Sequence, residues 1–213
     1  MINKKAFLGA SMILFLALQI LAVDKPFSVT EGYGVARTNS PIDGGIAFKK
    51  GEVTDINQLA LFRGSTEIPA QFTSLVRNKD NSIQWVLTSF TDNFTAGETK
   101  NYTLKTQAQT AQAPVKITMS RTGSVITFTN GDMVFSIDTL NFRGVHSLSY
   151  KGKDLISGNG GLSMLDVPHG TASVNGTVTK SAFLYKGDLR VSLRVEGIFF
   201  KDSAGGVGYS YTV

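Results

Sequence analysis

The sequence predicts an all-β protein built from two antiparallel modules, and three observations support this fold class. Charged residues make up only 17% of the 213 residues, whereas hydrophobic residues make up 42% and 22 residues are glycine. This composition favours sheets over helical bundles. Apolar and polar residues alternate, and turn-forming residues recur about every 8–12 positions, as in sandwiches and small barrels. Helical spacing of apolar residues is essentially absent beyond the N-terminal segment.

The N-terminal segment has the pattern of an export signal. Met1–Lys5 carries two lysines, and Ala6–Ala22 is an apolar run interrupted only by Ser11 and Gln19. A basic start, an apolar run and a small residue at Ala22 predict a cleaved signal peptide over residues 1–22. The alternative is a membrane anchor, since about 17 apolar residues can just span a bilayer. We expect cleavage, and therefore a secreted or periplasmic protein that has no membrane association.

Composition excludes several kinds of site. The chain contains no cysteine, which rules out disulfides, thiolate zinc sites, iron–sulfur clusters and cysteine nucleophiles. Its two histidines, His146 and His169, are too few for a histidine-rich metal site. The formal net charge of +5 includes Lys4 and Lys5 of the export signal, so the remaining charge is too mild to indicate a nucleic-acid partner. We expect no metal, no cofactor and no nucleic acid.

The first module is expected over residues 23–107. A turn is predicted at Pro41–Gly45, and Pro69 is expected near a sheet edge, where a missing amide costs least. In the strand that follows the Asn78–Asn81 turn, Ile83, Trp85 and Leu87 share one face, so we expect Trp85 to anchor the core. The predicted strands of this module are 46–48, 59–63, 68–76, 82–90 and 100–106.

A polar segment separates this module from the second. Residues 108–114 are rich in Gln, Ala and Thr and lack large apolar side chains, which predicts a linker. The second module is expected over residues 115–213. Its predicted strands are 115–119, 124–130, 133–138, 174–178, 182–185, 189–197 and 207–213, with a hairpin around residues 150–154. Because the sequence stops within an apolar strand, we expect this module to be truncated.

An ordered set of short motifs runs through both modules. The motifs are Gly44–Gly51, Glu67–Gln71, Asp80–Val86, Ala96–Tyr102, Ile126–Ile137 and Gly187–Gly197. In this order they resemble the N-terminal barrel domain and the start of the central β-sandwich of the exo-rhamnogalacturonan lyases and their YetA-like relatives. The barrel pattern of that family runs G-V-P-F-x-x-G, x-V-P-x-Q, W-P-D-G-S-I-x-W and A-G-x-x-x-x-Y. The resemblance covers nearly all of the chain after the export signal.

This resemblance implies a RIFT-like barrel over residues 23–107, followed by an incomplete antiparallel β-sandwich. It implies rhamnogalacturonan-type pectin as the polysaccharide partner. It also implies a missing C-terminal domain of the same protein, a helical (α/α) toroid that carries most of the catalytic groups. One departure is that Arg77-Asn78-Lys79 replaces the family's Trp-Pro, which removes an aromatic residue from the neighbourhood of a ligand. The chain is therefore expected to be a non-catalytic part of a polysaccharide lyase-like protein.

Eliminative cleavage of pectin needs a base, a cation that stabilises the enolate and an acid. No complete set of this kind is present, so no catalytic residue is assigned. Arg143 and His146 lie three residues apart beside a glycine and could converge on an anion. The alternative is an exposed hairpin with ordinary polar residues. His169 is expected to be a solvated loop residue.

Arg190 and Arg194 are the other candidate binding residues. They lie four residues apart along a predicted strand, so they are expected to point to one face of the sheet. That face could bind an acidic sugar, or it could be a sheet surface covered by ion pairs. Two further functions remain open for the whole chain, namely a stand-alone secreted carbohydrate-binding module and a structural β-domain of a surface assembly.

Overall fold

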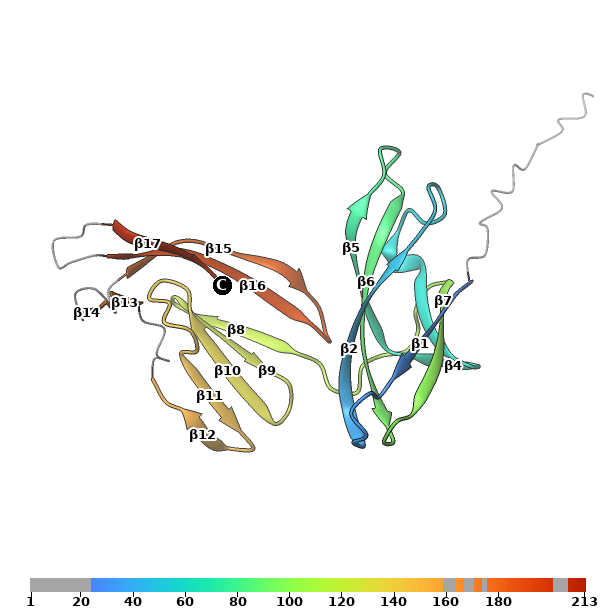
Figure 1. Ribbon diagram of the computed structural model, residues 1–213, viewed down its shortest axis with the longest axis horizontal. Helices are drawn as coiled ribbons and strands as arrows, with labels where there is room; N and C mark the ends of the chain where they lie inside the picture. The colour runs from blue at the N-terminus through green and yellow to red at the C-terminus, as the bar shows by residue number, and fades with distance from the viewer. Residues whose placement is uncertain (1–23, 159–163, 167–170, 174–175, 201–206) are drawn as a thin grey trace, which may run out of the picture.

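The computed structural model describes residues 24–158, 164–166, 171–173, 176–200 and 207–213. The predicted signal peptide and His169 lie outside these residues. Throughout the described ranges the chain is all-β, and its one helical element is the short 3₁₀ turn η1 (Ile56–Gln58). Figure 1 shows two sets of antiparallel sheets, which we call the first module (residues 24–106) and the second module (residues 118–213).

The first module contains two sheets with the strand orders β1-β7-β3-β4 and β2-β6-β5. Neither sheet closes on itself by hydrogen bonds within residues 24–106. The strands are β1 (Asp24–Thr30), β2 (Arg37–Ala47), β3 (Leu59–Arg63), β4 (Thr66–Ile68), β5 (Ala70–Arg77), β6 (Ile83–Phe94) and β7 (Thr99–Thr106). Each sheet is amphipathic, so their apolar faces pack against each other and leave the other faces to solvent.

Two clusters of buried side chains fill the space between these sheets. One is centred on Leu59, Val86 and Leu104, and the other on Phe90 and Tyr102. The rings of Phe90 and Tyr102 meet edge to face, with centroids 4.9 Å apart. Because residues of β3, β6 and β7 contribute to both clusters, the core runs the length of the module.

The second module is a five-stranded sheet, β12-β11-β10-β9-β8, and a three-stranded sheet, β15-β16-β17, with the small pair β13-β14. Phe128 on the larger sheet contacts Phe183 on the smaller one, with ring centroids 6.4 Å apart. The strands are β8 (Thr118–Thr122), β9 (Val125–Thr129), β10 (Met133–Asp138), β11 (Ser147–Tyr150), β12 (Lys153–Ile156), β13 (Met164–Asp166), β14 (Thr171–Ser173), β15 (Gly176–Lys186), β16 (Val191–Phe200) and β17 (Val207–Thr212).

The predicted strand 115–119 is displaced, since β8 begins only at Thr118, and three further predictions of strands or turns are wrong for physical reasons. Pro41–Gly45 lies within β2 rather than in a turn, because β2 is an edge strand where Pro41 needs no amide partner on its free side. The predicted strand 68–76 divides at Pro69 into β4 and β5, which belong to different sheets. From Gly176 onward, the two predicted strands 174–178 and 182–185 belong to one continuous strand, β15, whose pairing with β16 contains two register shifts; residues 174–175 lie outside the described residues.

The segment that connects the modules (residues 107–117) contains no strand, yet it is held to both of them. Gln109 exchanges two hydrogen bonds with the backbone of Ala70, both of 2.9 Å. Glu67 accepts hydrogen bonds from the backbone amides of Thr110 and Ala111 at 2.6 and 3.0 Å. At the other end, the amide of Ile117 donates to the carbonyl of Asp188 at 2.8 Å.

Candidate functional site

Trp85 does not lie in the core, which corrects the sequence prediction. Its side chain is 41% exposed, whereas Ile83 and Val86 are fully buried. Strand β6 has an extra residue between Ile83 and Trp85, because these two pair with the consecutive residues Arg77 and Val76 of β5. Such a bulge reverses the alternation of side chains. Ile83 and Val86 therefore both point into the core although they are three residues apart, and Trp85 lies on the outer face of the sheet.

The indole ring of Trp85 lies over a glycine on that outer face. A Cβ atom at Gly45 would approach Cε3 and Cζ3 of Trp85 to 3.3 Å, which is tighter than ordinary van der Waals contact. Ala47 pairs directly with Trp85 on one side, and the exposed Val76 pairs with it on the other. The absence of a side chain at Gly45 and the small side chain of Ala47 thus leave the aromatic ring accessible on the open sheet.

Cations surround this end of the sheet. The loop after β2 carries Lys49 and Lys50, and the turn between β5 and β6 carries Arg77 and Lys79; all four are exposed. Arg77 donates from Nη1 to the backbone carbonyls of Thr54 and Asn81, at 3.1 and 2.7 Å. Within the part of the chain that the structure describes, none of these four cations forms an ion pair.

The carboxylates of the same two loops have other partners. Glu52 pairs with Lys25 at 2.8 Å. Burial would raise the pKa of Glu52, but the hydrogen bonds from Lys25 and the Lys49 amide lower it overall. The Ser82 hydroxyl and backbone amide donate to Asp80 and lower its pKa. Lys49 and Lys50 also lower the pKa of Glu52 and Asp80, respectively, by electrostatic attraction. Both acids stay ionised, but the four exposed cations outnumber them, which leaves this end of the sheet net positive.

The outer face also receives the second module. Counted along β6, Trp85 and Leu87 are followed on this face by Ser89, which is paired with Asp43 of β2 and Gln71 of β5. Gln71 and Asp43, the two residues that flank Ser89, contact the turn between β15 and β16. Ser89 itself lies about 13 Å along the strand from Trp85. Figure 1 shows the tip of the β15–β16 hairpin meeting the first module beside β2.

The structure does not gather the four candidate binding residues into one site. Arg190 lies in that turn and pairs with Asp43 of the first module, with Nη1 and Oδ2 2.8 Å apart. Arg194 lies on β16 and pairs with Glu196 of the same strand at 2.9 Å. Both arginines therefore form ion pairs, but their partners belong to different modules.

Arg143 and His146 lie in the connection between β10 and β11. Both side chains are half-buried, and the His146 amide donates to the carbonyl of Ser136 at 2.8 Å. Gly144 between them has a positive φ of 82°, which makes the turn that the sequence suggested. Both lie on the same connection within the described residues, and their joint binding of an anion stays a prediction.

Two carboxylates whose side chains are almost inaccessible, Glu31 and Asp92, organise the first module, and no sequence motif marks either of them. Glu31 accepts hydrogen bonds from the amides of Gly97, Tyr33 and Val35 and from Arg37 Nε, at 3.0–3.2 Å. The Gly97 amide contributes most, and together these bonds outweigh burial and lower the pKa of Glu31 to about 2. This carboxylate closes the loop after β1 onto the β6–β7 turn.

Asp92 is the other carboxylate, and it accepts hydrogen bonds from the side chains of Arg63, Lys100 and Tyr102. Tyr102 Oη donates to Asp92 Oδ2 at 2.8 Å, and Arg63 Nη1 lies 2.6 Å from Oδ1. Burial would raise the pKa of Asp92, but these donors lower it. Burial and the neighbouring carboxylate both raise the pKa of Tyr102. Such a fully engaged network holds the fold and leaves no group poised for proton transfer.

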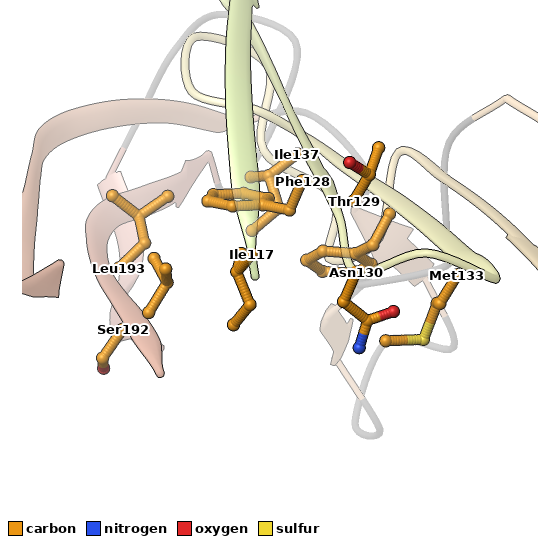
Figure 2. A pocket seen from close by; sticks show the side chains of 10 residues that line it. Ile117, Phe128, Thr129, Asn130, Met133, Ile137, Ser192 and Leu193 are labelled. Carbon is orange, nitrogen blue, oxygen red and sulfur yellow. The ribbon is translucent and has the colours of Figure 1, made fainter. Parts of the chain in front are cut away.

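An open cavity of about 410 Å³ lies between the two sheets of the second module. Figure 2 shows side chains of Ile117, Phe128, Ile137 and Leu193 around it, with the polar groups of Thr129, Asn130 and Ser192. None of its lining residues is charged. The cavity therefore offers apolar surface and three uncharged polar side chains, but no charged group that could pair with the carboxylate of an acidic sugar.

Among the described residues, no group of three or more histidine, aspartate or glutamate side chains is arranged to hold a metal ion. In the same part of the chain there is no helix long and apolar enough to cross a membrane. No known protein family matches the sequence, and no curated protein is significantly similar to it.

Proposed function

We propose that this chain is the exported, non-catalytic β-region of a polysaccharide lyase-like protein and that it holds rhamnogalacturonan-type pectin. The outer face of the β2-β6-β5 sheet is the proposed contact surface, with Trp85 as its platform. The observation that carries this proposal is the 41% exposed side chain of Trp85, whose indole ring approaches Gly45 on the outer face of the sheet. An aromatic face of this kind offers apolar area to one face of a sugar ring at little cost in side-chain entropy.

The charges around Trp85 support an acidic polysaccharide. Uronate carboxylates carried by the polymer would meet Lys50 and Lys79, which are exposed and outnumber Asp80, the acid that attracts Lys50. Long-range attraction by such cations speeds association and depends on ionic strength. The resemblance of the short motifs in both modules to the rhamnogalacturonan lyases implies the same polymer, and it implies that catalysis belongs to an (α/α) toroid domain.

The proposal includes a RIFT-like barrel for the first module and part of a β-sandwich for the second. Two packed sheets over residues 24–106 are compatible with a RIFT-like barrel that is open between its sheets. The two facing sheets of the second module are compatible with part of a β-sandwich. In this arrangement the modules support the polysaccharide while the toroid cleaves it, and the location is secreted or periplasmic.

Binding of pectin-derived rhamnogalacturonan oligosaccharides by isothermal calorimetry tests the proposal. We expect Trp85→Ala to weaken binding by about tenfold or more, which corresponds to about 1.4 kcal/mol. Because Trp85 is outside the core, the substitution should lower the free energy of unfolding by only about 1 kcal/mol. The matched control is Tyr150→Ala, which removes an exposed aromatic residue from β11 of the second module and should leave binding unchanged.

A double substitution of two lysines tests how much charge contributes to polysaccharide binding. Lys50→Gln combined with Lys79→Gln should weaken binding to the acidic oligosaccharide at low salt and leave binding to a neutral glucan unaltered. Equal binding by wild type and Trp85→Ala would overturn the proposed surface. Wild-type protein that binds no polysaccharide would favour the structural β-domain. Formation of unsaturated uronate by the purified chain alone would contradict the non-catalytic role.

A further inference from the structure

The two modules meet through a turn that lies on the outer face of the first module. Residues 187–190 connect β15 to β16, and their backbone approaches Gln71 of β5. The Oε1 atom of Gln71 accepts hydrogen bonds from the amides of Leu189 and Arg190, at 3.1 and 2.9 Å. Its Nε2 atom donates to the Arg190 carbonyl at 3.0 Å. One carboxamide thus satisfies three backbone groups of the other module.

The fit around Gln71 requires a glycine at the start of the turn. A Cβ atom at Gly187 would overlap the Cδ and Oε1 atoms of Gln71. Gly187 does not need its freedom for an unusual backbone angle, since it is not among the glycines with positive φ. The absence of a side chain at Gly187 is therefore explained by the close approach of Gln71.

An ion pair supports the same contact. Arg190 pairs with Asp43 at 2.8 Å, and the hydroxyl of Ser89 donates to the same carboxylate. The guanidinium also lies over the ring of Tyr185, 5.3 Å from its centroid. Arg190 is thus held by groups of both modules, in an orientation that keeps the turn against β2 and β6.

The connecting segment keeps the two surfaces close. Residues 109–111 are bonded to the first module, and residues 116–117 are bonded to the turn itself through Asp188. The four residues between these anchors span at most about 14 Å. A short tether makes the contact effectively intramolecular, so a few hydrogen bonds suffice to hold it closed.

From these contacts we infer that Gln71 and the turn 187–190 form a latch that fixes the angle between the modules. Gln71 is the positioning residue of this latch. When it is closed, the β15–β16 hairpin stands on the same face as Trp85. When it is open, only the connecting segment joins the modules. The inference rests on the hydrogen bonds and on Gly187, and it is independent of what Trp85 binds.

The distance between two spin labels, one on each module, reports the angle between the modules. Because the chain has no cysteine, Lys79→Cys and Lys153→Cys give one label pair, with one exposed site on each module. We expect a single narrow distance distribution for the otherwise unaltered chain. Gln71→Ala removes the three hydrogen bonds and Gly187→Ala forces Gln71 out, so each should broaden the distribution and increase the radius of gyration.

Two further variants separate the latch from general damage. Gly44→Ala adds a methyl group in β2 where no atom lies within 4 Å, and it should leave the distances unaltered. In the double variant Gln71→Ala and Gly187→Ala, the clashing side chain is gone, so the second change should add nothing to the first. A narrow distribution in Gln71→Ala, a broad one in the unaltered chain, or full additivity in the double variant would overturn the latch.

Discussion

The two modules use the same kind of sheet pairing but are stabilised to different degrees. Buried ionised groups and two continuous apolar clusters organise the first module, with Glu31 and Asp92 each accepting hydrogen bonds from several donors. The second module has an open cavity of about 410 Å³ between its sheets. Among the described residues, the first module is therefore the better packed of the two. The position of the second depends on a few polar contacts.

The largest expected effect concerns packing. Leu104 is fully buried between the sheets of the first module, so Leu104→Ala should lower the free energy of unfolding by about 2–5 kcal/mol. Leu193 is only partly buried and lines an existing cavity in the second module, so Leu193→Ala should lower the free energy of unfolding by about 1 kcal/mol, the typical value for a point substitution. Urea unfolding measures both, with the fluorescence of the single tryptophan, Trp85, reporting the first module. Equal losses would remove the proposed difference in packing.

Acid should act on the first module before the second. The folded-state pKa of Glu31 is lowered to about 2 from an ordinary 4.5. Its ionised form therefore stabilises the fold fully above pH 4.5, and this contribution is lost as the pH falls from 4.5 towards 2. Of the described carboxylates whose pKa is lowered, only Asp138 belongs to the second module.

This acid sensitivity is measured by the urea midpoint of the Trp85 signal at successive pH values. The midpoint should fall steadily below pH 4.5, and Glu31→Gln should show a shallower fall over the same range. A variant that keeps the wild-type slope would show that Glu31 does not contribute to it. Loss of circular dichroism from the second module before any change at Trp85 would reverse the comparison.

The smallest effect is expected on the surface of the second module. Arg194 pairs with Glu196, and the Arg194 side chain is 49% exposed. An exposed pair of this kind contributes at most about 1 kcal/mol, so Arg194→Ala should leave both the unfolding midpoint and pectin binding nearly unchanged. Loss of oligosaccharide affinity would instead return Arg194 to the binding surface.

Sequence patterns predicted the regular parts of this fold well. Strand β3 coincides with the predicted range 59–63 and β10 with 133–138, because alternation and flanking turns are local signals. The sequence pattern did not predict which side chains of β6 face the core. A bulge depends on the pairing partner, here β5, and one extra residue was enough to move Trp85 from the core to the outer face.

The two consecutive glycines of β2 mark the candidate surface, but their sequence pattern predicts a turn. Gly44 and Gly45 were assigned to a turn, although glycine within a strand also marks the close approach of another group. That group is the ring of Trp85. The role of Gln71 had no local signal, because its partners lie more than one hundred residues away in the sequence.

The connecting segment has a practical consequence for cutting the chain in two. Its Gln-, Ala- and Thr-rich composition suggests an easy target for a protease, but Glu67 and Gln109 fasten residues 109–111 along the edge of the first module. Enzymatic cleavage needs several consecutive residues in an extended, accessible form. Nicking should therefore concentrate between Gln112 and Val115, and a fragment meant to retain the whole first module should end no earlier than Ala111.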